Sequence, residues 1–163
     1  MLGKPLIRTA YDDSNPIFRV MRRYGWGDLM NVGFYTLPTL PFVISGMAFF
    51  QRRLVERGLS LLALAPDQRV LDAACGRGYT TAALTGEGRT VVGLDLLDEH
   101  VALARARFAE VSGAHYAVAD ITRLPVSADG VSLADSSVDR VLCLAAGFQL
   151  LSLIHISEPT RPY

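Results

Sequence analysis

The sequence predicts an α/β protein built on a parallel sheet, because short apolar runs alternate with segments of helical periodicity. Half of the residues are apolar and a fifth are charged, which is the balance of a globular chain. The first apolar run of this alternation begins at Arg69. We therefore expect an N-terminal helical arm and lid over residues 1–66, followed by a half domain of Rossmann-like topology over residues 67–150.

The N-terminal part contains two predicted helices. Ile17–Tyr24 carries arginines on its polar side, and Pro41–Leu64 has apolar residues at helical spacing. Residues 29–50 carry no charge and are long enough to span a bilayer, but two prolines and two glycines interrupt them. We therefore expect a loop and a buried or lid-forming helix, and no stable membrane span.

Four strands are predicted between residues 67 and 150, each as a short apolar run. They are Arg69–Ala73, Thr90–Leu94, His115–Ala119 and Val138–Leu144, and helices at Tyr79–Thr85 and Leu97–Val111 connect the first three. Such alternation predicts one parallel sheet with right-handed crossovers and with helices on both faces.

A glycine-rich turn follows the first strand, in the sequence Asp72-Ala73-Ala74-Cys75-Gly76-Arg77-Gly78. The glycines at 76 and 78 allow the backbone to turn tightly and to approach a ligand closely. Open parallel sheets bind ligands at the carboxyl ends of their strands, where the strand order reverses. The turn is therefore a candidate ligand site, and a plain strand-to-helix turn is the alternative.

An aspartate stands at the end of each of the first three strands: Asp72, Asp95 and Asp120. Asp95 has the spacing from Gly78 expected of a carboxylate that accepts hydrogen bonds from both ribose hydroxyls, although it also suits the N-cap of the next helix. Asp72 is expected to face the ammonium group of a ligand or its water shell, and Asp120 an adenine amino group. The three acids together indicate a nucleoside-containing ligand.

Two cofactors fit this layout, NAD and S-adenosylmethionine (SAM). A dinucleotide turn needs the pattern G-x-G-x-x-G, and here Thr81 stands at the third glycine position. Asp72 would also bring negative charge close to a pyrophosphate. A cationic sulfonium ligand suits an acid-lined pocket better, so SAM is favoured and a dinucleotide-binding oxidoreductase remains the alternative.

These residues together resemble the class I SAM-dependent methyltransferases of the small-molecule, type 11-like kind. The turn is similar to the signature D-x-G-C-G-x-G, with Ala74 in place of the first glycine. Further motifs of the family are similar to Gly93-Leu94-Asp95, Ala119-Asp120-Ile121, Arg123-Leu124-Pro125 and 135–143, while Ser127–Ser132 are extra residues without an explanation. The resemblance implies a SAM site made by Asp72, Ala74, Cys75, Gly76, Gly78, Asp95, Leu96, Asp120 and Ile121.

The same resemblance suggests where the methyl acceptor binds. Met30–Tyr35 is similar to an aromatic segment of these enzymes, which implies that Tyr11, Phe34 and Tyr35 cover the sulfonium or the acceptor. Plain aromatic packing is the alternative. Gln149 stands where some relatives carry a histidine, so no general base is assigned.

The resemblance also implies that the chain holds only part of a fold. The family sheet has seven strands, and only the first four are predicted here. Residues 151–163 are similar to a translated sequencing adapter, so we expect a non-native tail, a native protein that continues past residue 150, and a truncated fragment without activity.

Composition restricts the partners. Sixteen basic residues balance 16 acidic ones, so no nucleic-acid partner is expected. Two distant cysteines indicate reduced thiols in a cytoplasmic protein, and three scattered histidines predict no metal site. The expected partner is a small, hydrophobic methyl acceptor, and a non-catalytic nucleotide-binding or membrane-associated protein is a further alternative.

Overall fold

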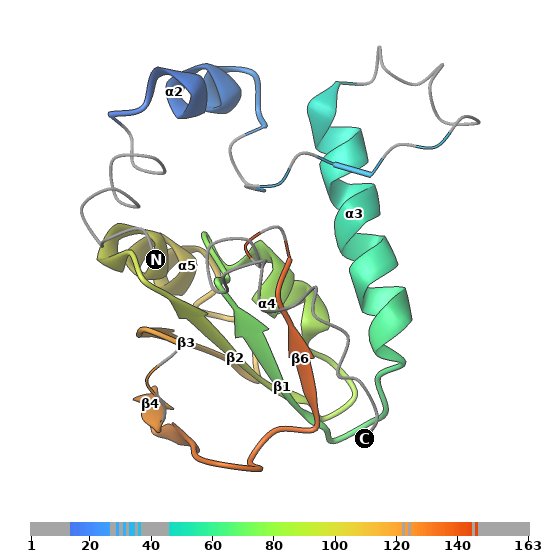
Figure 1. The fold of residues 1–163 in the computed structure, drawn as a ribbon, viewed down its shortest axis with the longest axis vertical. Helices are drawn as coiled ribbons and strands as arrows, with labels where there is room; N and C mark the ends of the chain where they lie inside the picture. The colour runs from blue at the N-terminus through green and yellow to red at the C-terminus, as the bar shows by residue number, and fades with distance from the viewer. Residues whose placement is uncertain are drawn as a thin grey trace, which may run out of the picture.

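A four-stranded parallel sheet forms the centre of the computed structural model, in the order β3-β2-β1-β6 (Figure 1). The structure describes residues 14–26, 29, 31, 33, 34, 36, 46–121, 123, 125–144 and 146. The sheet strands are β1 (Arg69–Ala73), β2 (Thr90–Asp95), β3 (Ala114–Val118) and β6 (Arg140–Leu142). The predicted parallel sheet is therefore confirmed, with a last strand shorter than the predicted Val138–Leu144.

In the described part of the chain, four helices accompany the sheet: α2 (Pro16–Arg23), α3 (Met47–Leu62), α4 (Tyr79–Leu84) and α5 (Asp98–Arg107). The prediction that the last of these continues to Val111 is wrong. Phe108 packs against the cluster around Cys75 and Tyr116, and the amide of Val111 bonds to the carbonyl of Phe108 in a turn. This turn redirects the chain into β3.

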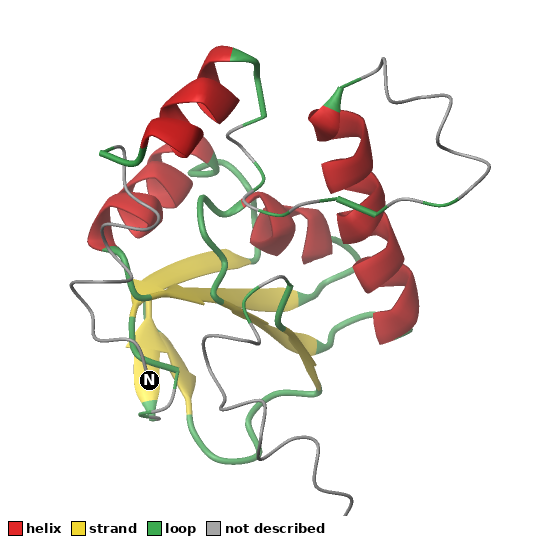
Figure 2. Ribbon diagram, turned by 45° about the horizontal axis from the view of Figure 1, so that its top comes forward, coloured by secondary structure: helices red, strands yellow, loops and turns green. Residues whose placement is uncertain are grey.

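The helices α3, α4 and α5 lie together on one face of the sheet (Figure 2). Val70, Val91 and Leu142 point toward this face and pack with Leu84 of α4. The crossovers from β1 to β2 and from β2 to β3 advance in the same direction, so their right-handedness puts α4 and α5 on the same side. In the described part of the chain, the prediction of helices on both faces is therefore wrong.

A two-stranded hairpin covers the other face of the sheet. It consists of β4 (Val126–Ala128) and β5 (Val131–Leu133), and it buries Ala128 and Leu133 against Leu71, Val92 and Leu94. Its two loop residues, Asp129 and Gly130, both have positive φ angles, 47° and 85°, as in a type I′ turn. The extra residues Ser127–Ser132 therefore have a structural explanation.

The N-terminal segment is attached to α3 through Gln51, whose side chain is 1% exposed. Its amide nitrogen donates to the backbone oxygens of Trp26, Leu29 and Asn31. The helix α2 lies toward the end of the molecule to which the strands point (Figure 1). Among the helices that the structure describes, none is long and apolar enough to cross a membrane.

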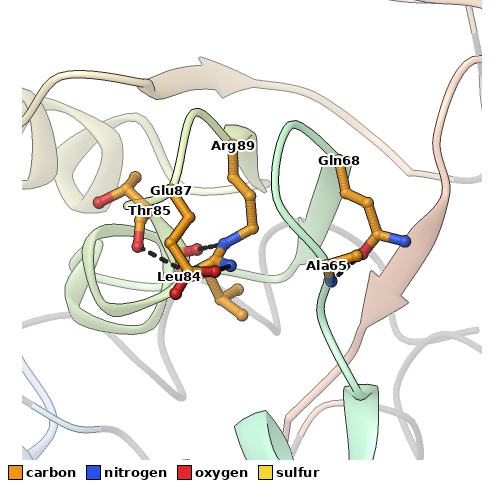
Figure 3. A network of polar contacts seen from close by, with 6 residues as sticks. All are labelled: Ala65, Gln68, Leu84, Thr85, Glu87 and Arg89. Carbon is orange, nitrogen blue, oxygen red and sulfur yellow. Dashed lines mark hydrogen bonds and ion pairs between the residues drawn. The ribbon is translucent and has the colours of Figure 1, made fainter.

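Arg89 stabilises the opposite end of the sheet, in the loop that connects α4 to β2 (Figure 3). Its guanidinium donates to the carbonyls of Leu84 and Thr85 at the end of α4, and it pairs with Glu87 at 2.8 Å. The amide of Ala65 is bonded nearby by the side chain of Gln68. These contacts fix the amino ends of β1 and β2. The candidate site lies at the other ends of the same strands, their carboxyl ends.

Candidate functional site

The turn after β1 has three residues in the left-handed region: Ala74, Gly76 and Gly78, with φ angles of 61°, 55° and 84°. The amide of Cys75 bonds to the carbonyl of Leu94 at 2.9 Å, which draws the turn over the end of β2. The position that the family signature gives to its first glycine is thus held by an alanine in a conformation that favours glycine.

Gly78 is required by packing as well as by its backbone conformation. A Cβ atom at this position would lie 2.6 Å from Cβ of Ala104 and 2.9 Å from the ring of Tyr116. The hydroxyl of Tyr116 donates to the carbonyl of Gly78 at 3.1 Å. The start of α4 is therefore pressed against α5 and β3.

Asp95 joins the turn to the following helix. Its Oδ2 accepts a hydrogen bond of 2.8 Å from the amide of Gly76, and its Oδ1 accepts one of 2.9 Å from the amide of Leu97. Leu97 is the N-cap residue of α5, so Asp95 is not the N-cap. Each carboxylate oxygen has a second lone pair, and the predicted bonds to ribose hydroxyls stay a prediction.

Asp72 lies beneath the turn and is 1% exposed. Its Oδ2 accepts a hydrogen bond of 2.7 Å from the hydroxyl of Thr81. Burial raises the pKa of the Asp72 carboxyl to about 7, and the charge of Asp95 adds to the rise while the Thr81 hydrogen bond opposes it. Its predicted contact with the ligand's ammonium stays a prediction.

Thr81 and Gly93 together replace the third glycine of a dinucleotide turn, which serves close packing between helix and strand. Here the threonine side chain of α4 points at β2, and the strand provides the space. A Cβ atom on Gly93 would lie 2.5 Å from Oγ1 of Thr81 and 3.0 Å from Cβ of Cys75. The close approach is made by a glycine on the strand, so a threonine fits on the helix.

The remaining predicted cofactor residues lie at the same edge of the sheet. Asp120 and Ile121 follow β3, and the amide of Ala119 bonds to the carbonyl of Asp95 at 2.9 Å. Ile121 packs against the core on the hairpin side, and Leu96 is half-buried beside Asp95. Asp120 lies 3.7 Å from the guanidinium of Arg123. Their roles toward a ligand stay predictions.

The predicted acceptor residues are only partly visible. The backbone amide of Phe34 donates a hydrogen bond to the carbonyl of Phe50. Phe34 is half-buried, and Phe50 lies at the start of α3. The structure therefore places the backbone of Phe34 against the first turn of α3. Tyr11 and Tyr35 lie outside the described residues, as does the tail 151–163.

Three side chains of this region were not predicted as site residues: Thr81, Tyr116 and His100. Thr81 and Tyr116 hold the turn from below, through the bonds to Asp72 and Gly78. His100 is 3% exposed, and its Nδ1 lies 3.5 Å from Oδ1 of Asp95. The sequence contains one signal for His100 as a site residue, its position as a polar residue in the first helical turn after Asp95.

The chemistry of the site suits a nucleoside with a cationic tail. Among the described residues, no group of histidines, cysteines or acids could hold a metal ion. The cysteine of the turn does not suit a nucleophile, because burial raises the pKa of the Cys75 thiol well above its usual range. What remains is a glycine-lined backbone beside Asp95 and Asp72, which fits SAM; bound SAM supplies an electrophilic methyl group.

Comparisons with known proteins give the same family. Residues 70–158 match the family described as the methyltransferase domain, which is more than half of the chain. The chain is 34% identical over 100 residues to the S-adenosyl-L-methionine-dependent Diels-Alderase iccD of Talaromyces variabilis, covering 61% of this chain and 32% of that protein. It is 30% identical over 112 residues to the malonyl-[acyl-carrier protein] O-methyltransferase of Serratia marcescens, covering 69% and 43%.

Among solved structures, the mycolic acid cyclopropane synthase CmaA1 has a similar fold. The TM-score is 0.55 at 20% identity, and the likeness covers 84% of this chain and 43% of that chain. The chain thus spans less than half of the length of these three proteins. The comparisons give no support to the alternative of a dinucleotide-binding oxidoreductase.

The match over residues 70–158 contains the turn at Gly76 and Gly78, the acids Asp72, Asp95 and Asp120, and the four sheet strands that bring them to one edge. The predicted fold and the predicted cofactor agree with that family. The chain belongs to the SAM-dependent methyltransferase domain family.

Proposed function

We propose that the protein to which this chain belongs transfers a methyl group from SAM to a small, hydrophobic metabolite. The observation that carries the proposal is the hydrogen bond between the amide of Gly76 and the carboxylate of Asp95 at the carboxyl ends of β1 and β2. It joins the glycine turn to the acid that ends β2, next to the point where the strand order reverses between β1 and β6.

The proposed division of labour follows from the side chains present. The backbone of Gly76 and Gly78 allows close approach of the ligand, and Asp95 accepts hydrogen bonds from its ribose. Asp72 contributes negative charge beneath a cationic ligand. Methyl transfer of this kind depends on holding donor and acceptor in line, so positioning accounts for much of the rate. No general base is assigned.

A hydrophobic acceptor is supported by the uncharged segment 29–50, and an organic substrate other than nucleic acid is supported by the names of two relatives. One relative is named a malonyl-[acyl-carrier protein] O-methyltransferase, and another a Diels-Alderase. The balanced charge of the chain, 16 basic against 16 acidic residues, argues against a nucleic-acid substrate. We propose that the N-terminal residues 1–66, which include Phe34, Tyr11 and Tyr35, cover the acceptor.

A second candidate function is SAM-dependent ring formation without methyl transfer. It is favoured by one observation, the 34% identity to a protein named a SAM-dependent Diels-Alderase. The two functions share the cofactor site and differ in the fate of the methyl group. An extract incubated with SAM labelled in its methyl group separates them, because only methyl transfer places the label in an organic product.

Cofactor binding is tested first, by calorimetric titration of the chain with SAM and with NADH. We expect SAM binding and no NADH binding. Asp95→Asn should weaken SAM at least tenfold, because it removes the charge that strengthens the hydrogen bonds to the ribose and also one of the two oxygens that accept the amides of Gly76 and Leu97. Asp98→Asn, on the exposed first turn of α5, is the matched control and should bind as the unaltered chain does. NADH binding without SAM binding would overturn the proposal.

Activity is tested on a protein that spans the length of the relatives, because this chain spans less than half of theirs. We expect label from SAM in an apolar metabolite, and no transfer by the 163-residue chain alone. Label recovered only in RNA, or only in polar acceptors, would contradict the proposed substrate class.

A further inference from the structure

His100 is a buried polar residue at the edge of the candidate site. It lies in the first turn of α5 and is 3% exposed. Its neighbours in the helix, Val101 and Ala104, are buried in the apolar cluster with Cys75 and Tyr116. The imidazole instead faces the carboxylate of Asp95, with Nδ1 at 3.5 Å from Oδ1.

The two ring nitrogens of His100 have different surroundings. The carboxylate that faces Nδ1 favours the tautomer with its proton on Nδ1, and in the neutral imidazole this makes Nε2 a bare acceptor. Nε2 is buried and has no hydrogen-bond partner in the described part of the chain. A buried acceptor without a donor is costly, and leucine or methionine would fill a purely structural position without that cost.

The unpaired nitrogen therefore needs a donor that the described residues do not provide. Asp95 already bonds to the amides of Gly76 and Leu97, and so connects His100 to the glycine turn. On the proposed function, SAM binds beside Asp95, and its adenosine carries donors on its ribose hydroxyls and on its exocyclic amine.

We propose that His100 belongs to the cofactor site, where Nε2 accepts a hydrogen bond from a donor of the adenosyl group while Nδ1 positions the carboxylate of Asp95. This inference rests on the proposed function, because it requires SAM or its product S-adenosylhomocysteine (SAH) to bind beside Asp95. The inference adds to the site a residue whose side chain contacts the nucleoside directly.

The test uses calorimetric titration of the full chain with SAH and three substitutions at one position. His100→Gln brings an amide near the place of Nε2, His100→Asn brings one near the place of Nδ1, and His100→Leu removes both. We expect SAH binding to weaken at least tenfold in the Leu and Asn variants and less than threefold in the Gln variant. His115→Asn, on β3, is the matched control and should bind normally.

Folding is followed separately through thermal unfolding without ligand. We expect His100→Leu to be as stable as the unaltered chain or more stable, because an unpaired buried nitrogen is removed. A variant that loses SAH binding while its unfolding temperature is unchanged cannot be explained by misfolding. Equal SAH binding by all the variants would overturn the proposal for His100 alone, whereas no SAH binding by the unaltered chain would overturn the proposed function as well.

The donor is identified with three analogues of SAH, which lack the 6-amino group, the 2′-hydroxyl or the 3′-hydroxyl. We expect one of these groups to interact with His100, so that its removal weakens binding by a smaller factor in His100→Leu than in the unaltered chain; for a hydroxyl, the penalty from its bond to Asp95 remains in both. The ¹⁵N resonance of Nε2, assigned by its absence in His100→Asn, should shift when SAH is added. Penalties for all three analogues that His100→Leu leaves unchanged would overturn the proposal.

Discussion

The carboxylate of Asp129, at the tip of the β4–β5 hairpin, accepts a hydrogen bond of 3.0 Å from the backbone amide of Tyr116 in β3. Its other oxygen pairs with Arg105 at 2.8 Å, and Arg105 also donates to the carbonyl of Tyr116. The strand β3 lies at the edge of the described sheet, and these two side chains satisfy the backbone N–H and C=O of Tyr116 on that edge.

Asp129→Ala is expected to lower the free energy of unfolding by about 1–3 kcal/mol, because it leaves the amide of Tyr116 without an acceptor. Asp129→Asn keeps an oxygen for that amide and loses only the half-exposed ion pair with Arg105, so its loss should stay below about 1 kcal/mol. Urea unfolding measures both values, with the exposed Ser127→Ala as the control. Equal losses for Ala and Asn would show that the ion pair matters and that the amide bond does not.

Gly78→Ala should be strongly destabilising, by about 2–4 kcal/mol, because the added methyl would collide with Ala104 and Tyr116 in addition to straining a left-handed backbone. Gly130→Ala is the matched control. Its φ of 85° is similar, but nothing lies within 4 Å of the added Cβ atom, so only the backbone cost of about 1 kcal/mol is expected. Similar losses in urea unfolding would mean that packing at Gly78 is relaxed.

The sheet and its site could be predicted from the sequence because the signals are local. Apolar runs mark β1, β2 and β3, and an aspartate stands within two residues of the end of each. The hairpin is not among the predicted strands, although its signal is also local, an Asp-Gly pair at 129–130 between alternating apolar positions.

The contacts of the site could not be predicted in the same way, since they depend on packing between distant segments. Thr81 meets Asp72 only because Gly93 allows α4 to approach β2 closely. His100 meets Asp95 only because the first turn of α5 folds back over the end of β2. The direction of a side chain at the start of a helix has no sequence signature. Neither Thr81 nor His100 could therefore be assigned its partner from the sequence.

Gln51→Leu should release the N-terminal segment from α3, because three backbone carbonyls lose their shared donor. Limited trypsin digestion measures this through cleavage at the exposed Arg22 and Arg23. We expect cleavage there about tenfold faster, as for the loss of about 1.4 kcal/mol from a local opening reaction. Cleavage at Arg107 in the same sample is the internal control, and equal acceleration at both places would indicate general unfolding.

Ala74→Gly is expected to stabilise the fold by about 0.5–1 kcal/mol. Ala74 has a φ of 61°, a conformation that costs an L-residue about 1–2 kcal/mol, and the greater freedom of glycine in the unfolded chain returns only part of this gain. Ala73→Gly, at the buried end of β1, is the control and should destabilise. A loss of stability in both variants under urea would contradict strain at Ala74.

Asp72 makes the stability of the fold depend on pH. Because its pKa is raised from 3.8 to about 7, the folded chain holds a proton that the unfolded chain has released between about pH 4 and pH 7. Stability therefore falls as the pH rises through this window, by up to about 4 kcal/mol, and the loss is complete above pH 7. Asp72→Asn carries no charge and should remove this dependence, so it should match the unaltered chain near pH 4 and be more stable at pH 8.

Thr81→Val removes the hydrogen bond that lowers the pKa of Asp72, so the pH range over which stability falls should extend upward. Urea unfolding from pH 4 to pH 8 measures all three, and a pH profile of Asp72→Asn that parallels the unaltered chain would show that Asp72 is not the titrating group.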